Sequence, residues 1–157
     1  MLHYHSVVIF VKDVKKSKEF YENTLEQQLE FDFGKNVGFT SGITLWEITT
    51  GHIIPDTLKD KVKAPGNRFE LYFESEDIQD TFAKLKERGV EFLHEIHEEP
   101  WGQFSVRFFD PDGHLLEVGE TLDTFVNRIY EETGSVEDTS KRTTIPEEML
   151  KQIIENF

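Results

Sequence analysis

Residues 7–21 read Val-Val-Ile-Phe-Val-Lys-Asp-Val-Lys-Lys-Ser-Lys-Glu-Phe-Tyr, a β-branched run that leads through Asp13 into apolar residues at helical spacing. Residues 69–85 read Phe-Glu-Leu-Tyr-Phe-Glu-Ser-Glu-Asp-Ile-Gln-Asp-Thr-Phe-Ala-Lys-Leu and follow the same order, with Asp77 lying 64 positions after Asp13 (77 minus 13). Aspartate is a favoured helix N-cap, and apolar residues spaced by three or four indicate an amphipathic helix. The chain therefore predicts a strand followed by a helix twice, as an internal repeat.

β-rich sequence follows each predicted helix, and turns containing glycine or proline divide it into strands. The predicted strands lie at about 28–33, 37–41 and 43–49 in the first half, and at 90–96, 104–109 and 114–120 in the second. Both halves thus read β-α-β-β-β. The predicted fold class is α+β, with two tandem βαβββ modules.

The sequence also predicts how the chain is divided. It gives a first module at 1–49, a linker containing glycine and proline at 50–66, a second module at 67–120 and a C-terminal extension at 121–157. The extension lies outside the repeat and has two short amphipathic segments, at 123–132 and 146–154. Because an apolar stripe on a helix needs a partner surface, the extension is expected to pack on the modules or to form a homodimer contact.

Composition excludes several classes of protein. Hydrophobic residues make up 37% of the 157 residues and aromatic residues 13%, which is enough for a folded core. A formal charge of −14 repels nucleic acid and anionic membranes, and it indicates either an ordinary soluble cytosolic surface or a preference for cationic small-molecule ligands. The absence of cysteine excludes disulfides, thiolate metal sites and a cysteine nucleophile. No apolar run approaches the ~20 residues of a membrane span, so a cytoplasmic location is expected.

Two stretches together suggest a family. Residues 11–21, and the closing Asp-Pro-Asp-Gly-His-Leu-Leu-Glu at 110–117, resemble the two signatures of the vicinal-oxygen-chelate superfamily, which includes glyoxalase I and the bleomycin-resistance proteins. The resemblance covers roughly residues 4–120. It implies that the eight strands of the two modules form a curled sheet around a shared cleft. It also implies a divalent metal in that cleft, held by side chains from the first and last strands of each module.

Four positions of this chain match the family's ligand positions. They are Ser6, Thr44 or Glu47, Glu70 and Glu117. Metal-binding members commonly have histidine where this chain has Ser6. The neighbouring His5 is in line with Val7, Ile9 and Val11 on the helix face of the first strand, so it would need a β-bulge to reach the cleft.

Strand alternation gives an independent indication for the second module, because successive residues face opposite sides of a sheet. An apolar row through Leu71 and Phe73 is expected to pack beneath the helix, which sends Glu70 and Tyr72 to the other face. In the last strand the same rule sends Glu117 to that face. Two carboxylates are therefore expected to converge there.

Two interpretations of the chemistry remain open at this point. If Glu47 is the fourth position, Glu47, Glu70 and Glu117 form an all-oxygen set that suits Mg²⁺ or Mn²⁺ better than Zn²⁺, and the family also admits Ni²⁺. If Thr44 is the fourth position, two carboxylates remain and no metal is expected. Glu70 and Glu117 would then raise each other's pKa, and one of them would serve as a catalytic acid or base.

These interpretations give two functional hypotheses. The first is a metal-dependent lyase or isomerase of the glyoxalase type. The second is a metal-free protein that sequesters a small, cationic ligand, as the resemblance to bleomycin-resistance proteins implies. Either ligand would lie among Ser6, Thr44, Tyr72 and Trp101, since an aromatic residue on a rigid turn, such as Trp101 between Pro100 and Gly102, either walls a cleft or caps the core.

Overall fold

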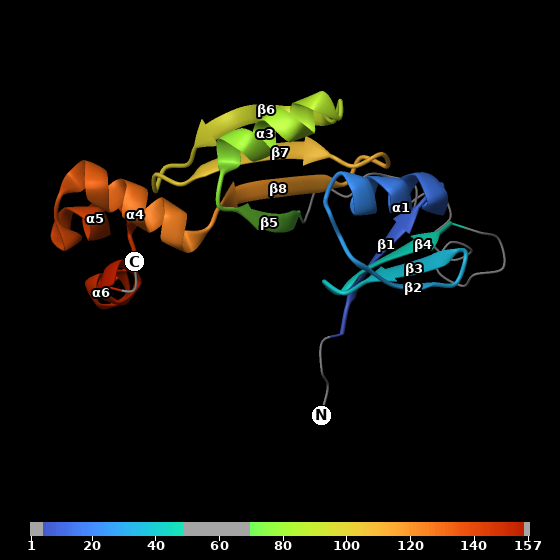
Figure 1. The fold of residues 1–157 in the computed structure, drawn as a ribbon, viewed down its shortest axis with the longest axis horizontal. Helices are drawn as coiled ribbons and strands as arrows, with labels where there is room; N and C mark the ends of the chain where they lie inside the picture. The colour runs from blue at the N-terminus through green and yellow to red at the C-terminus, as the bar shows by residue number, and fades with distance from the viewer. Residues whose placement is uncertain (1–4, 49–69, 156–157) are drawn as a thin grey trace. The chain divides into compact units, whose positions relative to one another are not determined.

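The structure, a computed structural model, describes residues 5–48 and 70–155, so the predicted linker at 50–66 lies outside the described residues. The chain divides into two compact units. The first contains β1 (Val7–Val11), α1 (Val14–Asn23), β2 (Leu29–Asp32), β3 (Asn36–Phe39) and β4 (Ile43–Glu47), together with the turn Asp110–His114. The second contains β5 (Leu71–Ser75), α3 (Ile78–Glu87), β6 (Glu91–Glu98), β7 (Phe104–Phe109) and β8 (Leu115–Glu120), followed by three helices (Figure 1).

The two sets of strands have the same topology. The first sheet has the order β1-β4-β3-β2 and the second the order β5-β8-β7-β6. In each sheet the outer first strand pairs in parallel with the last strand of its module, and the other pairs are antiparallel. The predicted α+β fold with two tandem βαβββ modules is confirmed, with the eight strands arranged as two four-stranded sheets.

Both predicted helix caps are confirmed. Asp13 has an extended backbone and accepts hydrogen bonds from Lys15 N (3.0 Å) and Lys16 N (3.1 Å), which starts α1. Asp77 does the same for α3 through Asp80 N at 2.9 Å. Each cap satisfies amide groups that a helix leaves without partners in its first turn, a contribution of about 1 kcal/mol.

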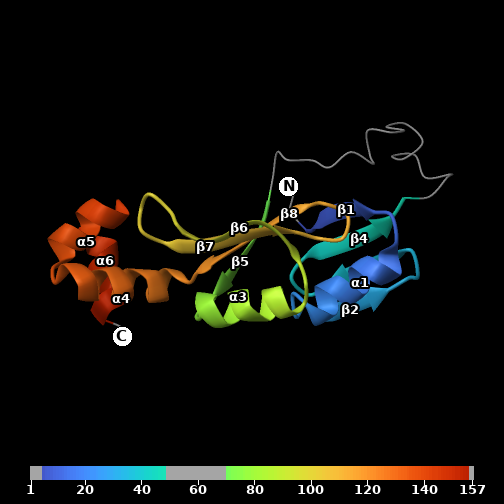
Figure 2. The same cartoon turned by 90° about the horizontal axis from the view of Figure 1, so that it is seen from above.

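The helices α1 and α3 each lie along one face of their own sheet (Figure 2). The residues on that face are apolar and buried. In the first unit the buried face consists of Ile9, Val11, Val37, Phe39 and Leu45, with Tyr21 of α1 stacked on Phe39 at a centroid distance of 5.8 Å. In the second unit it consists of Val106, Phe108, Leu116 and Val118. Full burial of such a side chain contributes roughly 1.5–3 kcal/mol, so these faces fix the register of the strands.

The Asp-Pro-Asp-Gly-His turn is held by one buried carboxylate. Asp110 accepts hydrogen bonds from the amides of Asp112 and His114, both at 2.9 Å, and from Tyr21 Oη at 3.2 Å, while His114 Nδ1 lies 2.8 Å from its Oδ2. Ser17 Oγ donates to Asp112 Oδ2 at 3.1 Å. The closing signature therefore acts here as a structural turn seated against α1.

The C-terminal extension contains three helices where the sequence predicted two: α4 (Leu122–Thr133), α5 (Val136–Thr143) and α6 (Glu147–Glu155). Gly134 ends α4 in a left-handed conformation, and Ser135 caps α5 by accepting from Asp138 N at 3.1 Å. The helix α5 was missed because its buried residues are threonines, so it has no apolar period. Among the described residues no helix is long and apolar enough to cross a membrane. A homodimer and a cytoplasmic location stay predictions.

Candidate functional site

Two of the candidate residues in the first unit lie on opposite faces of β4. Thr44 is the register partner of Val8, whose side chain is exposed on the face away from α1. Glu47 is the partner of the buried Val11, on the face that α1 covers, and its carboxylate accepts from Val14 N at 3.3 Å and pairs with Lys35 at 3.4 Å. The structure therefore places Thr44, and not Glu47, on the face away from the helix.

Ser6 and His5 lie just before β1. Ser6 is half-buried and His5 is exposed, and neither belongs to a strand. Ser6 and Thr44 belong to the first unit, whereas Glu70 and Glu117 belong to the second.

In the second unit one arginine joins the two candidate carboxylates. Arg107 Nε lies 2.9 Å from Glu70 Oε2, and Arg107 Nη2 lies 2.8 Å from Glu117 Oε2. Arg107 and Glu117 are direct cross-strand partners on β7 and β8, and Tyr72 faces Glu117 from the other side on β5. The parallel and antiparallel neighbours of β8 thus bring an arginine, a tyrosine and two carboxylates together on the face away from α3.

Arg107, Glu70, Glu117, Glu99 and His94 form a group that we call the charge cluster. Sequence reasoning missed three of its members, Arg107, Glu99 and His94. Arg107 Nη1 donates to Glu99 Oε1 at 2.7 Å and lies 3.4 Å from His94 Nε2. A register shift in β6 between Phe92 and His94 turns His94 toward Arg107. For Arg107 a signal was available, because Ser105 and Arg107 alternate with apolar Val106 and Phe108, which sends Arg107 to the face of Glu117.

The carboxylates of this cluster have different pKa values. Burial, and then the hydrogen bond with Glu70, raise the pKa of Glu117 to about 7, against the attraction of Arg107. Burial also works to raise the pKa of Glu70 and of Glu99, but hydrogen bonds from Arg107 outweigh it and hold both below their ordinary values. The Glu117 side chain is only 7% exposed and that of Glu70 is 34% exposed, which agrees with the stronger effect of burial on Glu117. Arg107, whose pKa these partners raise, stays charged.

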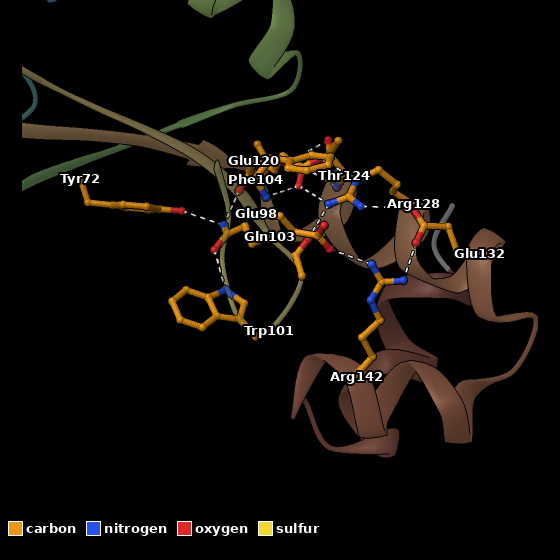
Figure 3. Close-up of polar contacts among 12 residues, drawn as sticks. Tyr72, Glu98, Trp101, Gln103, Phe104, Glu120, Thr124, Arg128, Glu132 and Arg142 are labelled. Atoms are coloured by element: carbon orange, nitrogen blue, oxygen red, sulfur yellow. Dashed lines mark hydrogen bonds and ion pairs between the residues drawn. The ribbon is translucent and has the colours of Figure 1, made fainter. Parts of the chain in front are cut away.

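Exposed aromatic rings lie beside this cluster. Tyr72 is 48% exposed and Trp101 is 39% exposed. Gln103 joins them, because its Nε2 donates to Tyr72 Oη at 3.1 Å and its Oε1 accepts from Trp101 Nε1 at 3.1 Å (Figure 3). The arrangement presents two aromatic rings and an amide to solvent on the same unit as the carboxylates.

The donor set does not fit the divalent metal that the resemblance implies. The guanidinium of Arg107 lies between Glu70 and Glu117 and already supplies their positive partner. A divalent cation bound to both carboxylates would have to displace that guanidinium or lie against it, which like charges oppose. Within the described residues no group of three or more histidines, aspartates and glutamates could hold a metal ion. Glu47, the third oxygen donor of the predicted set, is engaged at the start of α1.

Comparisons with known proteins agree with the modules described above. The model of the Glyoxalase-like domain matches residues 4–123. The uncharacterised protein YraH of Bacillus subtilis is 30% identical over 122 residues, which cover 73% of this chain and 94% of that protein.

Solved structures give the same result. A protein of unknown function from Agrobacterium tumefaciens is 33% identical, with a TM-score of 0.66 over 78% of this chain and 96% of that one. A member of the glyoxalase/bleomycin resistance protein/dioxygenase superfamily from Sphaerobacter thermophilus is 28% identical, with a TM-score of 0.59 over 76% of this chain and 98% of that one. The chain therefore belongs to the glyoxalase-like family, within the vicinal-oxygen-chelate superfamily that its two signatures resemble.

Proposed function

We propose that this chain is a metal-independent member of the family that binds a small, cationic aromatic molecule on the face of the second sheet away from α3. The observation that carries the proposal is Arg107, whose guanidinium lies between the carboxylates of Glu70 and Glu117. An internal cation at this position supports a site that works without a metal.

The charge balance of the cluster supports a cationic ligand. Three carboxylates, those of Glu70, Glu99 and Glu117, surround the single guanidinium of Arg107. Even with Glu117 half protonated near pH 7, the ionised groups leave an excess of negative charge. The formal charge of −14 for the whole chain adds a field that attracts cations.

The exposed rings support an aromatic ligand. Tyr72 and Trp101 offer faces that stack on flat molecules and attract positive charge through their π-electrons, an interaction that contributes about 0.5–2 kcal/mol per pair. Glu74, whose Oε1 lies 3.4 Å from Tyr72 Oη, places one more carboxylate next to this aromatic pair.

A matched set of probes tests this proposal. N-methylquinolinium, 2-naphthol and 2-naphthoate have fused rings of the same size and differ in charge. Titration calorimetry should give binding in the order cation, neutral, anion, and Tyr72→Ala and Trp101→Ala should each weaken cation binding about twofold to thirtyfold. Equal binding of the three probes, or binding that ignores both substitutions, would reject the proposal.

Metal addition tests the metal-independent part separately. Mg²⁺, Mn²⁺, Ni²⁺ and Zn²⁺ should leave the melting temperature of the purified protein unchanged, because a ligand stabilises a fold only by binding it. A saturable stabilisation that Glu117→Ala and Glu70→Ala abolish would instead favour the metal-dependent lyase or isomerase.

A second candidate function rests on Glu117. A carboxyl that is 7% exposed and has a pKa near 7 can both give and take a proton at neutral pH, as a general acid or base must. The residues on this face of the second sheet would then catalyse proton transfer on the bound molecule without a metal. Turnover of a bound probe that Glu117→Gln abolishes, with its affinity unchanged, would distinguish this enzyme from a binding protein.

A further inference from the structure

The C-terminal helices lie outside the family's matched region but against the candidate site. Residues 124–157 follow the last residue that the glyoxalase-like model matches. Their apolar residues form a core of their own around Phe125, Val126, Ile129 and Leu150. We infer that these helices are a positioning element, which holds the turn between β6 and β7, and with it Trp101, in place beside Tyr72. The inference rests on the proposed function only in taking Trp101 and Tyr72 as ligand contacts.

Arg128 of α4 connects the helices to the side of this turn where β7 begins. Its Nη2 donates to the carbonyl oxygen of Gly102 at 2.7 Å, and its guanidinium pairs with Glu120 through contacts of 2.7 and 2.9 Å. The guanidinium also lies over the Phe104 ring at 4.1 Å from the centroid (Figure 3). The same Glu120 carboxylate accepts a hydrogen bond from Phe104 N at 2.8 Å. The Arg128–Glu120 ion pair therefore fixes the end of the turn where β7 begins.

Arg142 of α5 holds the other side of the turn. Its Nη2 lies 2.7 Å from Glu98 Oε1 at the end of β6, and its Nη1 pairs with Glu132 of α4. The turn is also closely packed, because a Cβ on Gly102 would lie 3.1 Å from Ile129 Cδ1 and 3.4 Å from Arg142 Nε. Gly102 has φ +98°, a conformation that disfavours other residues, so shape and backbone both require glycine here.

Gln103, at the end of the turn, connects it by hydrogen bonds to the two aromatic residues Trp101 and Tyr72. Its Nε2 donates to the Glu120 carbonyl oxygen at 2.8 Å and to Tyr72 Oη at 3.1 Å, and its Oε1 accepts from Trp101 at 3.1 Å. Figure 3 shows the continuous series of contacts from Arg142 and Arg128 through Glu120 and Gln103 to Trp101 and Tyr72. Loss of Arg128 would leave Glu120, whose side chain is 4% exposed, without its cation and would release the turn.

Trp101 itself reports on the turn. The chain has two tryptophans, so in a Trp46→Phe background the tryptophan fluorescence, excited selectively over that of tyrosine, comes from Trp101 alone. Arg128→Gln and Arg142→Gln should each increase acrylamide quenching of Trp101 in the folded protein. They should also weaken N-methylquinolinium binding about tenfold, because two released side chains must lose their conformational freedom when the probe binds. Arg128→Lys keeps the positive charge but loses the bidentate contacts of the guanidinium. Its acrylamide quenching and its affinity for N-methylquinolinium should therefore lie between those of the parent protein and Arg128→Gln.

Lys141→Gln is the matched control. Lys141 lies on α5 next to Arg142, its side chain is 65% exposed, and it pairs with Glu137 and Asp138 of its own helix. This variant should leave quenching and binding unchanged. Measurement well below each melting temperature separates a released turn from simple loss of stability, because an evenly destabilised protein keeps its native quenching while folded.

The outcomes separate this inference from the proposed function. Unchanged quenching in folded Arg128→Gln and Arg142→Gln would overturn the inference, whatever the probes do. Increased quenching with no binding of N-methylquinolinium to the parent protein would support the positioning role and reject the proposed ligand class. If Arg128→Gln does not fold, Gly102→Ala carries the same test, since its added methyl group pushes the turn away from Ile129.

Discussion

The ring of Tyr72 lies across Gly119, so closely that a Cβ on Gly119 would come within 2.8 Å of Tyr72 Oη and 3.1 Å of its Cε2. Gly119 follows Glu117 on β8 by two residues and shares its face of the sheet. A glycine at this position lets the tyrosine lie flat along the sheet, where Gln103 can reach its hydroxyl at 3.1 Å. The position of Tyr72 thus depends on Gly119, which has no side chain to displace the ring, and on the side-chain amide of Gln103.

Gly119→Ala should therefore displace Tyr72. We expect a loss of about 1 kcal/mol in the free energy of unfolding from overpacking, together with weaker binding of N-methylquinolinium. In a Tyr72→Ala background the methyl group meets no ring and only Gln103 Nε2 still lies close, at 3.1 Å, so Gly119→Ala should then have a clearly smaller effect on both quantities. A double-mutant cycle by urea unfolding and calorimetry measures this coupling, and additive effects would contradict the proposed contact.

Asp110 should be a major contributor to stability in the first unit. Its carboxylate accepts two amides and lies against Tyr21 Oη and His114 Nδ1, and its side chain is fully buried. Asp110→Asn should cost about 2–3 kcal/mol of unfolding free energy, because an amide cannot accept all of these bonds and hydrogen bonds to a charged group are the stronger kind. Asp112→Asn, at a more peripheral carboxylate of the same turn, should cost clearly less by urea unfolding.

The stability that the Asp110 carboxyl contributes should depend on pH in the acidic range. Burial alone would raise the pKa of Asp110, but His114 and the turn amides outweigh it and hold the pKa below its ordinary value. A lowered pKa in the folded state means that this stabilisation is present above the ordinary value and is lost as the pH falls through the folded pKa. The gap in stability between the parent protein and Asp110→Asn should therefore narrow as the solution is acidified below about pH 4.

Local patterns in the sequence were sufficient for the modules and for the faces of the strands. The caps at Asp13 and Asp77 and the alternation around Glu70 and Glu117 depend on neighbours in the chain, and such signals are the ones that a single sequence carries. The side of β4 on which Glu47 lies could have been predicted in the same way, since Glu47 is two residues from the apolar Leu45 and so shares its buried face. The resemblance alone left that choice open.

Most of the charge cluster could not be predicted from the sequence, because its contacts join residues that local sequence patterns do not relate. Glu99 reaches Arg107 from beyond the end of β6, and His94 reaches it only because the β6 register shifts after Phe92. The series of contacts from Arg128 and Arg142 to the β6–β7 turn joins residues as far apart as Glu98 and Arg142. Such long-range pairs follow from the fold as a whole, and a propensity or period in the sequence does not indicate them.

The elevated pKa of Glu117 predicts a stability that falls with rising pH. A carboxyl whose pKa is about 7 when folded, against about 4.5 when unfolded, favours folding fully below pH 4.5, and this contribution is lost as the pH rises through 7. Between pH 5 and 8 the parent protein should lose about 1–2 kcal/mol relative to Glu117→Gln. This is less than the full shift implies, because part of the change falls between pH 4.5 and pH 5, and because solvent screens the charges around Glu70, whose side chain is 34% exposed.

Urea unfolding at several pH values measures this difference. Glu91→Gln, at an exposed position on β6, which β7 separates from β8, is the control and should run parallel to the parent protein. The range stops at pH 5 because the pKa of Glu70 is shifted downward, so its contribution changes with the opposite sign at lower pH. Parallel curves for the parent protein and Glu117→Gln across pH 5–8 would show that Glu117 does not titrate near neutrality.

Removal of Arg107 should convert the charge cluster into a cation site. Arg107→Ala leaves Glu70, Glu99 and Glu117 around the space that the guanidinium filled, three carboxylates that repel one another. At pH 8 we expect a loss of about 2–4 kcal/mol of unfolding free energy, and a smaller loss at pH 5, where protonation relieves the repulsion. Hard divalent cations prefer such oxygen donors, so Mg²⁺ or Mn²⁺ should restore part of the lost stability.

The parent protein and Arg88→Gln are the comparisons for this experiment. Arg88 is an exposed arginine at the end of α3, so its loss changes the net charge equally without touching the carboxylates. Millimolar Mg²⁺ or Mn²⁺ should raise the melting temperature of Arg107→Ala and leave the other two proteins unchanged. A similar rise in all three would mean that cations act on the overall charge. A rise in the parent protein alone would mean that Arg107 is compatible with a metal, and the metal-independent proposal would then fail.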